Sequence, residues 1–303
     1  MSRQAVIDTI IKLKKERDAV ILAHSYQVKE VQEVADFVGD SLELSREVTK
    51  VECSTIVFCG VHFMAESAKL LNPQKKVLLP VMEAGCPMAD MVTPEALKRA
   101  REKYPDAAVV CYINSSAAVK AESDICCTSS NAVKVVLSMP NKRILFVPDK
   151  NLASYVAGHV PGKEIIPWEG FCATHSAVTE RDVEEARIAH PGAEVAVHPE
   201  CSPAVARMAD YVGSTSGIIE RVSKSSCGAF IIGTEAGLLY RLQKDNPRKR
   251  FYLLSKGLIC PDMKKTRLED VLQALEKGKY LIEVEDEVRR RAVLSLERML
   301  SVV

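Results

Sequence analysis

Three cysteines recur at nearly equal intervals, and each lies in a short loop after an apolar run. The runs and their cysteines are Leu78–Met88 with Cys86, Ile165–His175 with Cys172 and Tyr252–Met263 with Cys260, so the thiols are 86 and 88 residues apart. A near-constant period indicates an internal repeat. Three thiolates without a fourth protein ligand suit an iron–sulfur cluster with one open iron, or a catalytic zinc ion that also binds water. Ligation by cysteine alone favours the cluster, because catalytic zinc sites usually include histidine.

The remaining cysteines do not follow this pattern. The chain has ten cysteines, and the other seven do not recur in all three segments. A free cysteine most often packs as a small hydrophobic side chain, and we expect this of those seven. No two cysteines have the Cys-x-x-Cys spacing, which argues against a zinc ribbon or a thioredoxin-like site.

Six polar side chains occupy equivalent places in the repeat, two residues apart where a predicted strand ends. They are His24 and Tyr26, Tyr112 and Asn114, and His198 and Glu200. A two-residue spacing puts both members of a pair on one face of an extended chain. These residue types can act as acid, base and hydrogen-bond partner. Glu200 is the best candidate for the general acid or base, because a carboxylate in a cavity beside a cluster can have a shifted pKa.

Hydroxyl groups open a further set of predicted helices, at Ser41, Ser129, Ser214 and Thr215. Each alone is most simply a helix N-cap. Converging helix N-termini also bind anions, and would form a pocket for a substrate with several carboxylates or a phosphate. Nucleotide-binding fingerprints are absent from the sequence. The residues together predict an enzyme with an open-iron cluster that catalyses dehydration, or condensation with loss of water.

The elements that must position these residues follow the same period. A capped helix and a strand recur from Ser2, Thr93, Thr179 and Thr266, and apolar strands alternate with helices. This pattern predicts an α/β fold of three homologous three-layer αβα domains with parallel sheets, arranged around a pseudo-threefold axis. The predicted domains are residues 1–88, 89–174 and 175–262, with the tail 263–303 completing the first. Ligands bind at the carboxyl ends of parallel strands, where every candidate residue lies.

Composition narrows the class of protein. The chain has 303 residues, 47% of them hydrophobic and 27% charged, with a net charge of +1. We therefore expect no nucleic-acid partner. No run is long enough to span a membrane, and the N-terminal stretch lacks the apolar region of a signal peptide. A cytoplasmic location is expected.

At these residues the chain resembles the quinolinate synthase A family over essentially its whole length. The segments that carry the resemblance include ILAHSYQ, ADFVGDSLELS, GCPMAD, YINSS, TSSNAV, GFCATH, VHPEC, YVGSTSGI and ICPDMK. The resemblance implies a pseudo-threefold fold and one 4Fe–4S cluster, bound by Cys86, Cys172 and Cys260 with one iron open. It implies a transferase that condenses iminosuccinate with dihydroxyacetone phosphate to quinolinate for NAD biosynthesis, releasing phosphate and water. The expected partners are these substrates and an aspartate oxidase or dehydrogenase that supplies iminosuccinate.

The resemblance also implies roles for individual residues. Catalysis is assigned to Glu200, Tyr26, Tyr112 and His198. Substrate binding is assigned to His24, Ser41, Tyr112, Asn114, Ser129, His175, His198, Glu200, Ser214 and Thr215. Two other hypotheses remain: a different open-iron 4Fe–4S dehydratase or hydratase acting on a small polyanionic substrate, and a non-catalytic scaffold with a structural metal.

Overall fold

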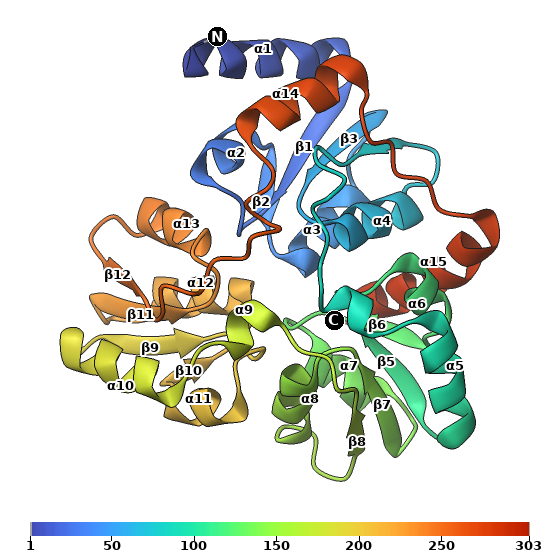
Figure 1. The fold of residues 1–303 in the computed structure, drawn as a ribbon, viewed down its shortest axis with the longest axis vertical. Coiled ribbons are helices and arrows are strands. Elements are labelled where there is room, and N and C mark those ends of the chain that lie inside the picture. The colour runs from blue at the N-terminus through green and yellow to red at the C-terminus, as the bar shows by residue number, and fades with distance from the viewer. Residues whose placement is uncertain (1, 303) are drawn as a thin grey trace.

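Three four-stranded parallel sheets form the framework of the computed structural model, which describes residues 2–302 (Figure 1). Their strand orders are β2-β1-β3-β4, β6-β5-β7-β8 and β10-β9-β11-β12, which is one order repeated three times. Helices flank each sheet, and the three units surround a common centre. The predicted α/β class with three αβα units is confirmed.

The strands are short and mostly buried. The first sheet contains β1 (Ala19–His24), β2 (Phe37–Gly39), β3 (Thr55–Cys59) and β4 (Lys76–Leu78). The second contains β5 (Ala108–Tyr112), β6 (Ile125–Cys127), β7 (Arg143–Val147) and β8 (Glu164–Pro167). The third contains β9 (Glu194–Val197), β10 (Tyr211–Val212), β11 (Ala229–Gly233) and β12 (Arg250–Leu253). Near-continuous Val, Ile and Leu runs fit strands that are covered on both faces.

The helices follow the same repeat. Those around the first sheet are α1 (Arg3–Glu16), α2 (Lys29–Val34), α3 (Ser41–Val48) and α4 (His62–Leu71). The next are η1 (Ala89–Met91), α5 (Pro94–Lys103), α6 (Ala117–Ala121), α7 (Ala132–Ser138) and α8 (Lys150–Ala157). The third group is α9 (Ala173–Ser176), α10 (Glu180–Ala189), α11 (Pro203–Met208), α12 (Thr215–Lys224) and α13 (Leu238–Asp245).

Side-chain caps begin three of the helices that were predicted to have one. Ser2, Thr93 and Thr179 accept hydrogen bonds from the first turns of α1, α5 and α10. The predicted cap at Thr266 is wrong, because α14 (Leu268–Lys277) has its N-cap at Arg267. The Thr266 side chain is fully buried instead, and its hydroxyl has no hydrogen-bond partner among residues 2–302.

The C-terminal tail contacts two of the three units. Helix α14 packs against α1, α2 and β3, and the following residues pair with the edge strand β4. There the Ile282 N–H donates to the Val77 carbonyl at 2.8 Å and the Leu79 N–H to that of Tyr280 at 3.1 Å. The last helix, α15 (Asp286–Ser301), packs against α6 and β6 of the second unit. The domain boundaries at 88, 174 and 262 stay a prediction.

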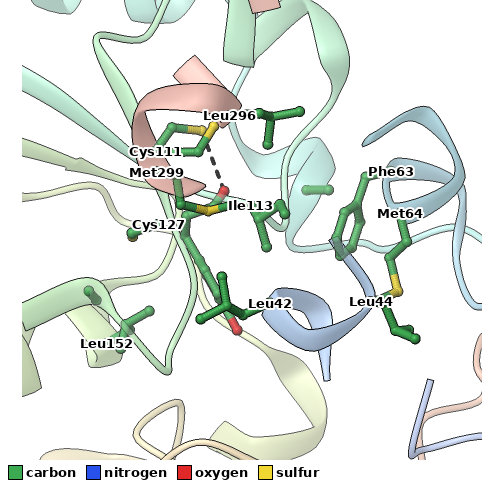
Figure 2. Close-up of a cluster of buried hydrophobic side chains, with 14 of the residues drawn as sticks. Leu42, Leu44, Phe63, Met64, Cys111, Ile113, Cys127, Leu152, Leu296 and Met299 are labelled. Atoms are coloured by element: carbon green, nitrogen blue, oxygen red, sulfur yellow. Dashed lines mark hydrogen bonds between the residues drawn. The ribbon is translucent and has the colours of Figure 1, made fainter. Parts of the chain in front are cut away.

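One hydrophobic cluster joins the first unit to the second (Figure 2). Its labelled members come from α3, α4, the second unit and α15: Leu42, Leu44, Phe63, Met64, Cys111, Ile113, Cys127, Leu152, Leu296 and Met299. Continuous burial between units holds their strand ends at fixed relative positions. Within residues 2–302, no helix is long and apolar enough to cross a membrane.

Candidate active site at the centre of the three units

A cavity of about 150 Å³ lies where the carboxyl ends of the three sheets converge. The first unit lines it with His24, Tyr26, Ser41 and Cys86, and the second with Tyr112, Asn114, Ser129 and Cys172. The third unit and the segment before it add His175, His198, Glu200, Thr215 and Cys260. The cavity therefore brings together all the residues singled out from the sequence except Ser214. That residue lies beside it as the N-cap of α12, where its Oγ accepts a hydrogen bond from the Gly217 N–H at 3.1 Å.

The three repeat cysteines line this one cavity, and each is a free thiol. Burial raises the pKa of Cys86 to about 12, and the charges of Glu200 and Cys260 add to the rise. Burial also raises the pKa of Cys172 and of Cys260 above the usual value for a thiol. Without a metal ion these thiols are protonated, so metal binding would displace protons from them. Three convergent, soft sulfur donors fit an iron–sulfur cluster.

Two buried carboxylates hold the loops of two of these cysteines. The Asp149 Oδ2 accepts a hydrogen bond from the Cys172 N–H at 3.2 Å, and the Glu235 Oε1 accepts one from the Cys260 N–H at 3.0 Å. Both carboxylates are fully buried, and each stands two residues after the third strand of its unit. The equivalent residue in the first unit is the apolar Val61. Two of the three cysteine loops thus depend on a buried acidic side chain, and burial together with the Glu200 charge raises the pKa of Asp149 to about 8.

The second oxygen of each carboxylate has its own donors. Asp149 caps α8 by accepting from the Leu152 N–H at 2.6 Å. Glu235 Oε2 accepts from the Gly237 N–H at 2.7 Å and from the Lys264 Nζ at 2.9 Å. Lys264 also donates to the Tyr26 carbonyl. Glu235 therefore links the loop of the third cysteine to the loop that carries Tyr26.

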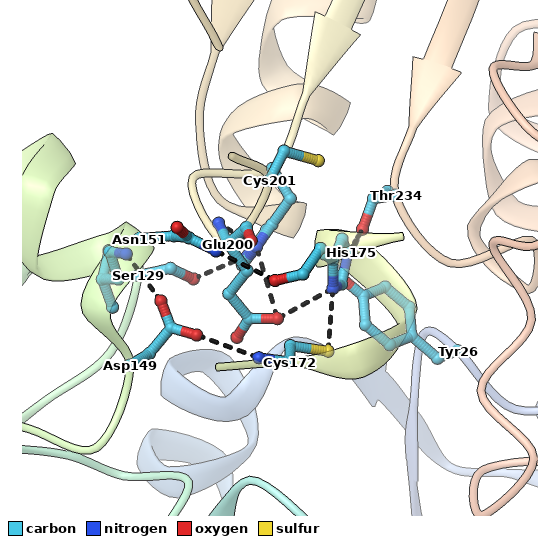
Figure 3. A network of polar contacts seen from close by, with 12 residues as sticks. Tyr26, Ser129, Asp149, Asn151, Cys172, His175, Glu200, Cys201 and Thr234 are labelled. Carbon is cyan, nitrogen blue, oxygen red and sulfur yellow. Dashed lines mark hydrogen bonds and ion pairs between the residues drawn. The ribbon is translucent and has the colours of Figure 1, made fainter. Parts of the chain in front are cut away.

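Glu200 lies at the centre of the polar network (Figure 3). Its Oε1 accepts a hydrogen bond from the Tyr112 hydroxyl at 2.6 Å, and its Oε2 lies 2.8 Å from the His175 Nδ1 and 3.8 Å from the His198 Nδ1. Burial favours the protonated carboxyl, but the adjacent His198 and His175 rings and the hydrogen bonds from His175 and Tyr112 favour the ionised form more strongly, so the pKa of Glu200 is lowered. Glu200 is ionised at neutral pH.

The two tyrosines that flank Glu200 are neutral. Burial and the Glu200 charge raise the pKa of Tyr112 well above its usual value. The same two effects raise the pKa of Tyr26, whose hydroxyl also bonds to Thr215 at 2.8 Å and to Thr234 at 2.7 Å. Both phenols can therefore supply a proton but do not lose one to water at neutral pH.

His24 and His198 occupy equivalent places and have the same environment. In each, the ring Nδ1 accepts the N–H of the residue two positions later, at 3.2 Å from Tyr26 and 3.3 Å from Glu200. This contact leaves the proton of the neutral ring on Nε2, and the His198 Nε2 lies 3.1 Å from the Ser129 Oγ. Burial lowers the pKa of both histidines to about 4. They are neutral hydrogen-bond donors at neutral pH.

Several residues of the site were missed by the sequence interpretation. Asp40 lines the cavity, caps α3, and accepts a hydrogen bond from the Ser130 Oγ at 2.7 Å, which joins the first unit to the second. Glu235 also lines the cavity, whereas Thr234 lies just behind it, bonded to two of its residues. Asp149 and Glu235 share a place in the repeat, so the period could have revealed them. Asp40 directly precedes Ser41, whose hydroxyl was interpreted as the helix N-cap, so the sequence interpretation did not consider Asp40 itself.

A second possible metal-ligand set overlaps the cysteines. Cys172, His175 and Glu200 offer sulfur, nitrogen and oxygen donors within 4.8 Å of one another.

One buried acceptor of the cavity is unpaired: the Asn114 Oδ1 has no hydrogen-bond partner in the described part of the chain. A buried unpaired acceptor costs free energy, and a substrate donor group in the cavity would satisfy it.

Comparison with known proteins identifies relatives over the full chain. The family model described as NadA, quinolinate synthetase A protein, matches residues 8–301. A quinolinate synthase of Alkaliphilus metalliredigens is 55% identical over 100% of both chains. One of Thermodesulfovibrio yellowstonii is 56% identical over 98% of both chains. Quinolinate synthase 2 of Methanosarcina acetivorans is 54% identical over 100% of this chain and 97% of its own.

Proposed function

Because the chain belongs to the quinolinate synthetase A family, we propose that it is a quinolinate synthase. The proposed reaction condenses iminosuccinate with dihydroxyacetone phosphate to quinolinate, with release of phosphate and water, in NAD biosynthesis. This makes the enzyme a transferase. One observation carries the proposal: a thiol from each unit lines the same cavity as the hydrogen-bonded set around Glu200.

Cys86, Cys172 and Cys260 would hold a 4Fe–4S cluster in this proposal. The fit is supported by three free thiols with no cysteine other than these three among the residues that line the cavity. Such a cluster keeps one iron open and supplies Lewis acidity.

The other lining residues would bind and orient the substrates. The Nε2–H groups of His24 and His198, and the N-termini of α3 and α12, suit carboxylate and phosphate oxygens. Ser41 and Thr215 are the first residues of those two helices. The unpaired Asn114 Oδ1 would accept a substrate N–H or O–H. Because both histidines are neutral at neutral pH, their Nε2–H groups can bind an anion without a change of protonation state.

Proton transfer falls to Glu200 and the two tyrosines. Loss of water and formation of a carbon–nitrogen double bond both need a base and an acid near the reacting atoms. Glu200 is ionised and lines the cavity, so it can accept a proton. Tyr112 already donates to Glu200 at 2.6 Å and can return a proton to a leaving oxygen. We also propose that an aspartate oxidase or dehydrogenase supplies the iminosuccinate.

Anaerobic purification tests the whole proposal. We expect a brown protein that contains iron and sulfide, absorbs as a 4Fe–4S protein and forms quinolinate only when both substrates are present. Turnover of another polyanion, without quinolinate, would favour the open-iron dehydratase or hydratase instead. A colourless, zinc-loaded protein that stays inactive after reconstitution would refute both.

A further inference from the structure

We propose that Cys111, Cys126 and Lys120 form a redox site in the core of the second unit, where hydrogen peroxide converts the two thiols to a disulfide. The three side chains come from β5, β6 and α6, and all of them are fully buried. None of them lines the central cavity. This inference therefore goes beyond the proposed function and does not depend on it.

The two cysteines lie directly opposite each other on neighbouring strands. Cys111 of β5 pairs with Cys126 of β6 in the parallel register. Neighbouring strands are about 4.8 Å apart, and laterally paired residues direct their side chains to the same face of the sheet. A disulfide joins Cα atoms that are about 4.4 to 6.8 Å apart. The backbone of this pair can thus accept a disulfide without moving.

Packing alone does not require thiols at this place in the repeat. The equivalent strand pairs of the other two units join Ala23 to Val38 and Val197 to Val212. Small apolar side chains therefore fill the same space in the first and third sheets. Only the second unit has a cysteine on both strands.

Lys120 is a buried cation without an acidic partner. Its Nζ donates a hydrogen bond to the Ser115 carbonyl and lies 5.4 Å from the centre of the Phe63 ring. No carboxylate of residues 2–302 pairs with it, and Glu122, two residues further on, pairs with Arg291 at 2.8 Å instead. A buried charge without a counter-charge is strongly destabilising. A thiolate in the cysteine pair supplies the missing negative charge.

The first unit shows that the carbonyl contact of Lys120 does not need a charge. Gln32 and Lys120 occupy the same place, four residues after the N-caps of α2 and α6. The Gln32 Nε2 donates to the Gln27 carbonyl at 2.9 Å, just as Lys120 donates to the carbonyl before its own N-cap. A neutral amide is therefore sufficient for this contact, and the charge of Lys120 acts on the thiols beside it.

The two thiols are not equivalent. Burial raises the pKa of Cys111, but the hydrogen bond from Cys126, the Lys120 charge and the Ser115 hydroxyl, 2.9 Å away, outweigh it and lower this pKa. Burial and the neighbouring Cys111 raise the pKa of Cys126. Cys111 is thus the thiolate that reacts first, and Cys126 is the protonated thiol that reacts second.

The oxidation is balanced and leaves no charge behind. The Cys111 thiolate attacks one peroxide oxygen, the O–O bond breaks, and a sulfenic acid forms. The departing hydroxide takes a proton from the Lys120 ammonium and becomes water. The Cys126 sulfur then displaces the sulfenic oxygen, which leaves with the Cys126 proton as a second water. The two sulfurs lose two electrons, the peroxide gains two, and the thiolate and ammonium charges disappear together.

The last helix controls access to the pair. Figure 2 shows Cys111 among the apolar side chains that include Leu296 and Met299 of α15. The Ser295 Oγ of the same helix lies 3.3 Å from the Cys126 Sγ. Hydrogen peroxide is little larger than water, and local opening of this terminal helix admits it.

Peptide mapping of the metal-free protein after treatment with hydrogen peroxide tests the site. Free thiols are alkylated, and trypsin then separates the two cysteines because it cleaves after Lys120. Cys111 is in the peptide 104–120 and Cys126 is in the peptide 121–134. We expect a species that joins these two peptides and disappears on reduction. Oxidised protein without this species would overturn the inference.

Two variants identify the second thiol, because the peptide 121–134 also contains Cys127. Cys126→Val introduces the residue that the first and third units have at this place. It should abolish the linked species, whereas Cys127→Ala should retain it. A linked species that persists in Cys126→Val would refute the assignment, and so would a disulfide between Cys126 and Cys127 within one peptide.

Lys120→Gln tests the role of the charge. Glutamine can keep the bond to the Ser115 carbonyl, as Gln32 does in the first unit, so we expect a native far-ultraviolet spectrum. The linked species should form about tenfold more slowly, because a smaller fraction of Cys111 is then thiolate. Cys59 is an internal control, since it is equally buried but has Ala23 opposite it, and it should stay reduced. Equal rates in Lys120→Gln and the wild type would remove Lys120 from the site.

The readouts separate this inference from the proposed function. None of them requires a cluster or the formation of quinolinate, so an inactive wild-type protein leaves the test intact. If Lys120→Gln does not fold, the linked species in the wild type and its loss in Cys126→Val still decide whether the disulfide forms.

Discussion

Replacing Glu200 by glutamine removes a negative charge and keeps the volume of the side chain. The carboxylate accepts from Tyr112 at 2.6 Å and from His175 at 2.8 Å. The amide oxygen of glutamine can keep the bond from Tyr112, and its NH₂ group then faces His175. His175 can accept from this NH₂ if its proton moves to Nε2, where Thr234 can accept it. All the buried groups stay paired after a change of tautomer.

The expected effects on stability and rate therefore differ. Because no buried donor or acceptor is left unpaired, the free energy of unfolding should change by less than about 1 kcal/mol. Loss of the base should lower kcat by about 10²- to 10⁴-fold, the usual contribution of general acid–base catalysis. This corresponds to about 3 to 5 kcal/mol in the activation barrier.

The assay compares quinolinate formation, iron content and urea unfolding of Glu200→Gln with the wild type, all without oxygen. Glu66→Gln is a matched control, because the Glu66 carboxylate also accepts a hydrogen bond, in its case from the Ala117 backbone N–H at 3.0 Å, but does not line the cavity. Activity of Glu200→Gln close to the wild-type value would refute the assignment of the base. Loss of iron together with activity would instead show that Glu200 helps to hold the metal.

Three further predictions concern the cluster, its anchors and the dependence of stability on pH. Cys86→Ala should abolish the 4Fe–4S absorption. The control Cys227→Ala changes a partly exposed thiol outside the cavity and should retain the absorption. A cluster retained in Cys86→Ala would overturn the ligand assignment. Glu235→Gln should speed iron loss to a chelator about tenfold, because the glutamine amide has one acceptor oxygen and cannot accept from both the Cys260 N–H and Lys264. A rate of iron loss equal to that of the wild type would show that Glu235 does not anchor the Cys260 loop. Burial lowers the pKa of His198 to about 4, whereas an unfolded histidine titrates near 6.5, so the folded state binds fewer protons between these values. As the pH falls from 6.5 to 4, urea unfolding of the metal-free wild type should lose up to about 3 kcal/mol more stability than His198→Gln does. An equal loss in both proteins would contradict this.

The repeat made most of the architecture predictable from the sequence. Strand ends, polar pairs and cysteine loops recur with one period, and parallel strands place their carboxyl ends on one edge. The position of α15 was not predictable in this way. Its apolar residues, such as Leu296 and Met299, require a partner surface but do not specify which unit provides it. Packing against α6 and β6 is a property of the folded surface.

The residues behind the cavity were harder to predict than those that line it. Thr234 appears in the sequence as one hydroxyl among many, and its two partners lie 208 and 59 residues away. Asp149 and Glu235 had a clearer pattern, but the first unit has Val61 at their place, so the recurrence is incomplete. A side chain that acts through another residue need not recur with the period of the repeat, so the sequence pattern does not reveal it.

The pairing of β4 with residues 280–282 has a consequence for synthesis on the ribosome. The core of the first unit contains Val6 and Ile10 from α1 together with Val271 and Leu275 from α14. The apolar face of α1 therefore cannot be buried in this core until residue 275 has been translated. The third sheet is complete as soon as residue 253 has emerged, so the first unit finishes folding after the third sheet can form, contrary to the usual order in which the earlier domain folds first.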